Sequence, residues 1–213
     1  MNSIIFHCLV IANRKKYLRW IELIQKSNGL SDVECQEINL FEQELQSYIG
    51  SESGPFLSWD RVNRAMIRHW CEAMGDANPA YYHADAAAQL GAPQNAVVAP
   101  PTMMQSWTMT GFSGEHPPGS DTRESMPVMP IFDRQGYLAV VATNCEQEYL
   151  QPICEGDDIN GRSSIESVSS QKTTGLGVGY FVTQLTEFRN QRDEVVGNMR
   201  FRILKYKPHS AVS

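Results

Sequence analysis

The sequence predicts an α+β fold in which one antiparallel sheet curls around a single central helix. Four strand-like runs follow one another in the second half of the chain, at residues 137–150, 157–168, 176–188 and 195–206. Turn-forming residues separate these runs, and the last one alternates apolar and polar side chains. An apolar segment that opens at Pro100-Pro101-Thr102 precedes them. Because a helix that is apolar on nearly all sides must be buried, we expect the sheet to wrap around it.

The composition is that of a globular protein. The chain has 213 residues, which fits one domain of ordinary size, and 42% of them are hydrophobic while 20% are charged. The formal net charge is −6 and the sequence pI is about 5.4. An acidic chain of this kind presents no basic face for a nucleic acid, so we expect none as a partner.

The five cysteines indicate reduced thiols. Their number is odd, and no two of them form a CxxC pair. This pattern favours a cytoplasmic protein over one built on disulfides or zinc, and no group of His, Cys, Asp and Glu has the spacing of metal ligands. We therefore expect no metal.

Residues 1–39 form a leader that we expect to lie outside the folded domain. Its apolar run at 4–12 is too short to span a bilayer, and the basic residues follow the run instead of preceding it as in a secretory signal. Residues 17–24 have the pattern of an amphipathic helix, so a role at a membrane surface or against a partner stays open.

The first half of the domain alternates helices with loops. The spacing of apolar residues predicts a helix over 40–49 that ends at Gly50, a loop over 51–59, and a second helix over about 62–74 that ends at Gly75. In the second helix we expect one buried face, formed by the apolar or aromatic residues Ala65, Met66, His69 with Trp70, and Ala73.

The segments that flank the central helix are less regular. Residues 76–79 predict a turn, 85–90 a short helix ended by Gly91, and 97–98 a brief strand. Residues 112–135 predict a long loop, and a loop of this length is usually functional or mobile. Its apolar members are candidates for a lid over a binding tunnel: Met126, Met129, Ile131 and Phe132.

Two interpretations of the apolar residues in the central segment stay open. Met103, Met104, Trp107, Met109 and Phe112 either form ordinary core packing or line a tunnel for a bulky ligand, since methionine adapts to irregular surfaces.

Elsewhere in the sheet two further expectations concern packing. Cys145, in the middle of a strand, is expected to be a small buried hydrophobe. The alternating glycines of 175–179 are expected to admit a neighbouring backbone or a ligand, not a phosphate group.

The turn Asp76-Ala77-Asn78-Pro79-Ala80-Tyr81 resembles the signature of the MaoC-like (R)-specific enoyl-CoA hydratases and dehydratases. Blocks in the same order support the resemblance, at residues 66–76, 99–109, 141–149 and 177–183. It covers about residues 40–208, with 209–213 as a tail, and implies the hotdog fold. The resemblance is strongest to the large subunit of hydratases that act on steroid or bile-acid side chains as CoA thioesters.

The same resemblance implies a defective catalytic dyad. In the family an Asp and a His five residues later activate or release water, but here Asp76 is followed by Tyr81. A phenol with a pKa of about 10 is a poor base at neutral pH. Catalytic relatives also place a His-Gly pair at the start of the central helix, whereas Pro101 has no N–H with which to polarise a thioester.

We therefore expect this chain to be the acyl-binding subunit of an enoyl-CoA hydratase, inactive alone and without a cofactor beyond its CoA thioester. The resemblance implies a small MaoC-like partner that carries an intact Asp and His. It also implies that an OB-fold module with a zinc ribbon, fused to some relatives, would here be a separate protein. We expect the substrate to contact Asn78, Pro101, Thr102, Met103 and Trp107.

Two alternatives remain open at this point. The first is a self-sufficient hydratase, dehydratase or thioesterase-like enzyme that uses Asp76 with Tyr81 or with a displaced His83. The second is a protein that only binds acyl-CoA or holds an assembly together. Asp76 itself is expected to serve the turn, because a carboxylate there can accept hydrogen bonds from backbone amides.

Overall fold

The computed structural model describes residues 32–123 and 125–209, so the expectations for residues 1–31 lie outside it. The chain divides into two compact units, residues 1–47 and 48–213. The first contributes α2, Asp32–Gln46, which begins earlier than the helix expected at 40–49. All other elements belong to the second unit.

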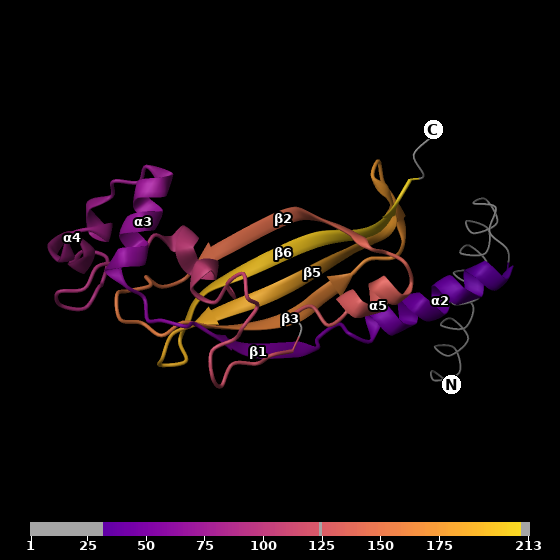
Figure 1. Cartoon of the computed structure of the whole chain (residues 1–213), viewed down its shortest axis with the longest axis horizontal. Helices are drawn as coiled ribbons and strands as arrows, with labels where there is room; N and C mark the ends of the chain where they lie inside the picture. Colours follow the sequence, from indigo (N-terminus) through magenta and orange to yellow (C-terminus); the bar gives the residue numbers. More distant parts are fainter. Residues whose placement is uncertain (1–31, 124, 210–213) are drawn as a thin grey trace, which may run out of the picture. The chain divides into compact units, whose positions relative to one another are not determined.

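A six-stranded antiparallel sheet dominates the second unit, in the order β1-β3-β5-β6-β2 with β4 paired to β5 (Figure 1). The strands are β1 Glu52–Leu57, β2 Ala139–Tyr149, β3 Asn160–Val168, β4 Lys172–Thr173, β5 Gly177–Arg189 and β6 Val195–Pro208. The four long runs predicted from the sequence are confirmed as β2, β3, β5 and β6.

The prediction of a loop at 51–59 is wrong, because most of this segment, Glu52–Leu57, forms the edge strand β1. The strand carries a bulge between Ser53 and Phe56, which lets Gly54 and Pro55 sit within it. Gly54 has φ +110°, and a Cβ there would lie 2.7 Å from the carbonyl oxygen of Gly161. A Gly-Pro pair therefore marks a bulged edge strand here, not a loop.

The glycines at the start of β5 allow close backbone approach, as expected. A Cβ at Gly177 or at Gly179 would collide with carbonyl oxygens of the neighbouring strand β6, at Lys207 and Lys205 respectively. These positions therefore bring β5 and β6 together and hold no ligand.

Two short helical elements cover opposite ends of the concave face of the sheet. The 3₁₀-helix η2, Pro101–Trp107, packs at one end in a core cluster that includes Phe188 and Met199. The helix α5, Met129–Arg134, packs at the other end, where the rings of Phe132 and Tyr180 lie 5.6 Å apart. The central helix is thus a short 3₁₀ segment, and the sheet is not closed around it.

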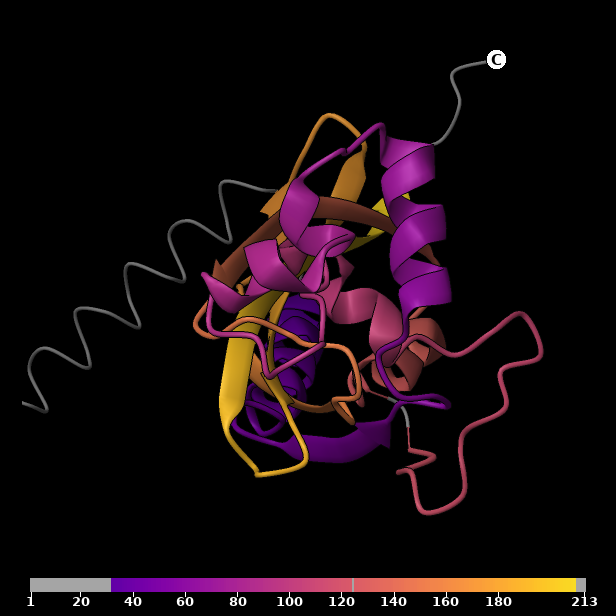
Figure 2. The same ribbon diagram turned by 90° about the vertical axis from the view of Figure 1, so that its left-hand side faces the viewer.

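The long loop expected at 112–135 contains α5, and its apolar residues are core, not lid. Met126, Ile131 and Phe132 are buried, while Met129 is half-buried. The helix begins just after Val128 with Pro130 in its first turn, a position where the missing N–H of proline costs nothing. The loop that precedes it, near residues 110–120, stands out from the sheet (Figure 2).

A helical cap covers the end of the unit that carries the turn at residues 76–79. It consists of α3 Arg64–Met74, η1 Pro79–Tyr81 and α4 Ala84–Ala88. The end of α3 at Gly75 is confirmed, but most of the face expected to be buried is wrong. Ile67 and Cys71 are buried, and of the expected residues only Trp70 is half-buried against the core cluster, whereas the others are exposed: Ala65, Met66, His69 and Ala73. Both sets satisfy helical spacing, so the pattern alone could not choose between them.

The two edges of the sheet differ. Loop residues cover β1: Leu57 N–H donates to Ser120 Oγ at 3.1 Å, and Asp121 N–H donates to the Pro55 carbonyl at 2.9 Å. Among the described residues β2 pairs only with β6. Nine of its eleven residues are exposed. Cys145 is therefore exposed and not buried as expected, because it lies in a largely exposed edge strand.

Candidate active site

The turn that follows α3 is held by its own side chains. The Asp76 carboxylate accepts a hydrogen bond from the Asn78 N–H at 3.1 Å, and the Asn78 side chain accepts one from the Ala80 N–H at 3.1 Å. The Tyr82 hydroxyl donates to the Asp76 carbonyl at 3.1 Å. Asp76 and Asn78 thus cap the turn and the start of η1, which is the structural role that their residue types favour.

Tyr81 lies half-buried at the wall of an apolar pocket of about 280 Å³. Burial raises the pKa of its phenol, and the charge of Asp76 raises it further, against a smaller lowering by a hydrogen bond with Asn78. The phenol therefore keeps its proton at neutral pH. It can donate a hydrogen bond but cannot act as a general base.

The start of η2 lines the same pocket. Pro101 and Met104 line it together with Tyr81, and most of the remaining wall is apolar: Leu90, Val98, Ala99, Leu150, Pro152, Ile153 and Val196. Because Pro100 and Pro101 have no N–H, this helix start offers no donor at either position. Thr102 is exposed at the surface. The structure brings the two altered positions together in a pocket without acid–base chemistry of its own.

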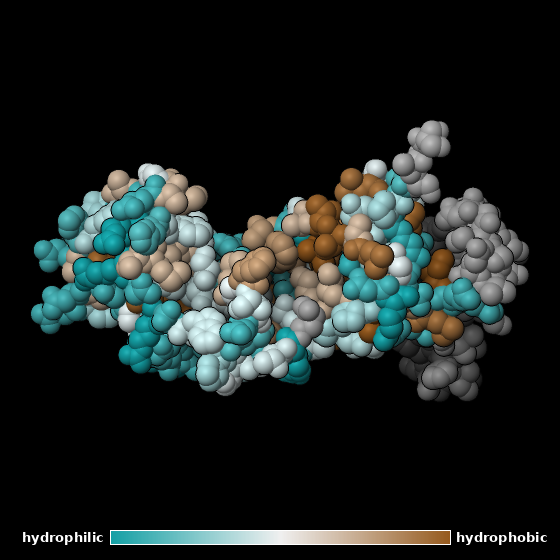
Figure 3. Space-filling model, in the orientation of Figure 1, coloured by the Kyte–Doolittle hydropathy of each residue, from teal (hydrophilic) through white to brown (hydrophobic). Residues whose placement is uncertain are grey.

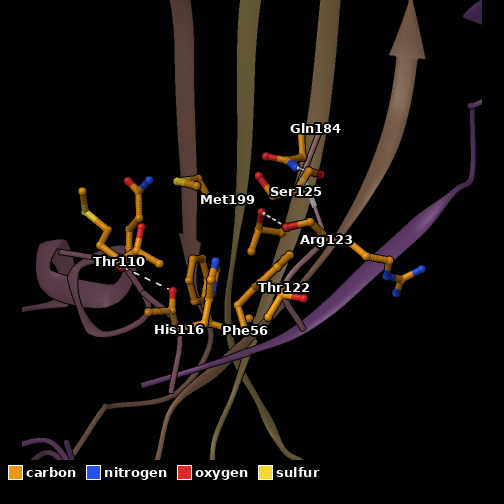
Figure 4. A pocket seen from close by; sticks show the side chains of 15 residues that line it. Phe56, Thr110, His116, Thr122, Arg123, Ser125, Gln184 and Met199 are labelled. Carbon is orange, nitrogen blue, oxygen red and sulfur yellow. Dashed lines mark hydrogen bonds between the residues drawn. The ribbon is translucent and has the colours of Figure 1, made fainter. Parts of the chain in front are cut away.

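A second cavity, of about 400 Å³, opens on the concave face, and its volume is within the range of about 300–1,000 Å³ usual for small-molecule sites. The surface of the unit is hollowed between the helical cap and α5 (Figure 3). The apolar walls are Phe56, Met109, Phe188 and Met199. Figure 4 shows His116 and Phe56 at one end and Gln184 with Ser125 at the other.

The floor of this cavity is polar although it belongs to the core face of the sheet. Ser163 on β3 and Thr186 on β5 are both buried, and their hydroxyl oxygens lie 2.9 Å apart. Gln184, two residues before Thr186, is also buried and donates from Nε2 to the Ser125 carbonyl at 2.5 Å. Buried polar side chains on the covered face of a sheet are uncommon and point to a site.

The structure separates the residues expected to bind substrate. Met103 and Trp107 are buried in the core cluster of the helical end, and neither lines the pocket of Tyr81 or the cavity on the concave face. The other side of the same segment, with Gln105, Thr108 and Met109, faces the cavity instead. Phe112 is fully exposed.

Sequence reasoning missed the polar floor. A usable signal was present, because alternate residues of β5 share one face, and Gln184 and Thr186 fall on the face of Tyr180 and Phe188. Two polar residues on an otherwise apolar face mark a site.

Neither His83 nor His69 lines the pocket beside Tyr81. His83 is the N-cap residue of α4, is exposed, and makes no capping hydrogen bond through its side chain. His69 is exposed, not packed at the core edge as expected, because it points away from the buried Ile67 and Cys71. Within the described ranges no group of three metal-ligating side chains occurs, and no helix is both long and apolar enough to cross a membrane.

Comparisons with known proteins agree with this geometry. The chain is 41% identical over 169 residues to a protein of Thermomonospora curvata named probable enoyl-CoA hydratase alpha subunit, covering 79% of this chain and 52% of that one. It is 38% identical over 185 residues to the 3-oxo-4,17-pregnadiene-20-carboxyl-CoA hydratase alpha subunit of Mycobacterium tuberculosis, covering 87% and 55%. The chain thus spans about half the length of these curated relatives.

Solved structures share the fold. A chain of the ChsH1–ChsH2 complex from Mycobacterium tuberculosis superposes with a TM-score of 0.70 at 37% identity, over 84% of this chain and 96% of that one. The MaoC-like dehydratase from Rhodospirillum rubrum superposes with a TM-score of 0.53 at 16% identity, over 76% and 94%, which shows the fold alone. Residues 47–199 match the family described as the FAS1-like, dehydratase domain region, and the chain belongs to that family of hotdog-fold proteins.

Proposed function

We propose that this chain is the acyl-binding subunit of a cytoplasmic enoyl-CoA hydratase and that a small MaoC-like partner performs the chemistry. The substrate is a 2-enoyl-CoA with a bulky, polycyclic acyl group, as the name of the mycobacterial relative implies. The reaction needs no cofactor beyond the CoA thioester.

The observation that carries this proposal is the pocket shared by Tyr81 and Pro101. Hydration requires a base that activates water, an acid that protonates the α-carbon, and donors at the thioester oxygen where enolate charge develops. The pocket offers a protonated phenol and a proline in the positions where the resemblance places a base and a donor. Asp76 is committed to the turn and does not line the pocket.

The edge strand β2, which in the described part of the chain pairs with β6 alone, supports pairing with a partner sheet. Long edge strands that lack protection are sites where another strand adds. β2 has eleven residues, no Lys or Pro, and only Glu146 and Glu148 as charges. Pairing there would extend the sheet into the partner and place the partner's acid–base residues beside the concave face of this chain.

The second cavity supports a bulky acyl group. η2 ends at Trp107, and the cavity of about 400 Å³ lies beside its last turn, with Gln105 and Thr108 in its wall. A longer helix would fill this space with side chains, whereas here Phe56, Met109 and Phe188 provide apolar walls for a rigid ring system. Met103 and Trp107 act from the core, where they hold η2 against β5 and β6.

The test is reconstitution with a partner that co-purifies with this chain. Hydration of a polycyclic enoyl-CoA, followed as loss of enoyl-thioester absorbance, is expected from the complex and not from either chain alone. Activity of the isolated chain that Asp76→Asn abolishes would instead establish the self-sufficient enzyme. Binding of acyl-CoA without turnover in any combination would establish a binding protein.

A further inference from the structure

The inner face of β5 changes character along its length. Its inward residues are apolar at both ends, at Tyr180 and Val182 and again at Phe188, and polar in the middle, at Gln184 and Thr186. The apolar ends are covered by α5 and η2, whereas the polar middle faces the cavity. Polarity on this face is thus confined to the part that a ligand can reach.

We propose that the buried polar residues Ser163, Gln184 and Thr186 recognise an oxygen substituent, a hydroxyl or a ketone, on the ring system of the acyl group. The inference rests on the proposed function for the identity of the acyl group and names a finer substrate class within it. The class is a polycyclic acyl-CoA that carries oxygen on its rings, in preference to a plain hydrocarbon of the same shape.

The hydrogen-bonding capacity of the three residues is not used up by the protein. One hydroxyl of the Ser163–Thr186 pair donates to the other, which leaves one hydroxyl hydrogen to donate and lone pairs to accept. Gln184 donates one Nε2 hydrogen to the Ser125 carbonyl, and its Oε1 has no partner among the described residues. Together they offer a donor and an acceptor to one ligand oxygen.

The energetics make these residues selective. Ser163, Gln184 and Thr186 are 4%, 6% and 6% exposed, so a ligand seated over them would exclude water. An unsubstituted ring would then leave their polar atoms without partners, and a buried polar group without a partner is costly. A ring oxygen replaces the lost water, so selection arises mainly from the penalty against the hydrocarbon.

The experiment compares matched ligands on the full chain and on its complex. Cholate and 5β-cholanate share a ring system and side chain and differ in ring hydroxyls. We expect cholate to bind the full chain at least tenfold more tightly by calorimetry, and the complex to prefer the hydroxylated enoyl-CoA in kcat/KM. Thr186→Val and Ser163→Ala should each reduce this preference roughly three- to tenfold, the value of one hydrogen bond.

Thr183→Val is the matched control, because Thr183 lies on β5 but on the outer face of the sheet and lines neither cavity. It should leave the preference unchanged. The proposal is overturned if cholate and cholanate bind equally tightly, or if Thr186→Val and Ser163→Ala, folded by their melting temperatures, keep the full preference. Turnover of the polycyclic enoyl-CoA separates the two levels: its absence from the complex contradicts the proposed function, while the calorimetric comparison on the full chain still tests the polar floor.

Discussion

Gly161 lines the cavity of about 400 Å³ on the concave face. It lies on β3, and a Cβ there would meet only ordinary contacts, 3.5 Å from Thr186 Cγ2 and 3.7 Å from Thr108 Oγ1. A small side chain would therefore fit without strain on the backbone. A large one would extend into the space between η2 and the sheet.

We predict that Gly161→Leu raises KM for a polycyclic enoyl-CoA at least tenfold, with little change in kcat. The added side chain removes acyl-binding volume without touching the partner's acid–base groups, and a loss of uniform binding appears in KM. Steady-state kinetics of the complex with polycyclic and ring-free thioesters check this, because only the former should be affected. Arg162→Leu, on the exposed face of the same strand, is the control; an equal rise in both variants would contradict the placement of the cavity.

Tyr81 occupies the position where the resemblance places a histidine base, but its phenol stays protonated at neutral pH. Its pKa is raised by burial and by the charge of Asp76. The proton therefore stays on the phenol across the neutral range. We predict that Tyr81→Phe in the complex leaves the pH profile of kcat/KM unchanged and lowers its maximum by less than tenfold. Disappearance of an ionisation from that profile would show that the phenol takes part in the chemistry.

At the scale of elements, Asp121 fastens the loop before α5 to the edge strand β1. Its Oδ2 accepts hydrogen bonds from the Gly54 N–H at 2.7 Å and from the Arg123 guanidinium at 2.7 Å. The hydrogen bonds from Arg123, followed by the one from Gly54, lower the pKa of this carboxyl well below its usual range. The loop is thus tied down by an ionised group.

We predict that Asp121→Asn lowers the melting temperature at neutral pH and that the difference from the natural chain begins to narrow as the pH falls below about 4. A carboxyl whose pKa is lower in the folded state contributes stability that is present above its unfolded pKa of about 3.9. That contribution is lost as the pH falls through the folded value. Melting temperatures of both chains between pH 7 and pH 3 test the sign. A gap that widens toward acid would contradict it.

The sequence predicted the long strands well because their signals are local. Runs such as 177–189 combine alternation with β-branched and aromatic residues, and turn residues bound them. The strand β1 was not predicted, because a Gly-Pro pair normally indicates a loop. The bulge that accommodates this pair depends on pairing with β3, which lies far away in the sequence. The buried face of α3 was not predicted correctly, because a face that contains Ile67 and a face that contains Met66 both satisfy the helical spacing. Packing against the rest of the unit decides which of them is buried.

The part of the candidate site that depends on the turn motif was predictable from the sequence. The part that depends on how distant strands pair was not. Tyr81 and Pro101 are remote in sequence, and the structure places them in one pocket as the resemblance implies. The polar floor formed by Ser163, Gln184 and Thr186 depends on strand register, with Ser163 opposite Thr186. Register is set by pairing across the sheet, which a single sequence does not state.

At the scale of the whole molecule, the free edge of β2 is where we expect the partner to bind. Cys145 lies in the middle of that strand and is exposed, whereas Cys71 and Cys154 are buried. Burial raises the pKa of both buried thiols, that of Cys154 to about 11, so neither should react at neutral pH. Cys145 is therefore a reporter for this edge.

We predict that a thiol reagent modifies Cys145 quickly in the free chain and at least tenfold more slowly in the complex. Cys8→Ser and Cys35→Ser remove the two remaining thiols from the measurement. Mass spectrometry of labelled peptides gives the rate. Unchanged labelling in a complex shown to be intact by sedimentation would place the partner on another surface.

The division of labour between two subunits is tested most directly by matched substitutions in the assembled complex. Asp76→Asn in this chain and a His→Ala change at the partner's dyad should both leave assembly intact by sedimentation. We predict that Asp76→Asn lowers kcat for the enoyl-CoA by less than tenfold, while the partner's substitution lowers it by about 10²–10⁴, the usual cost of an acid–base group. The reverse result, with Asp76→Asn abolishing turnover and the partner's histidine dispensable, would contradict the account.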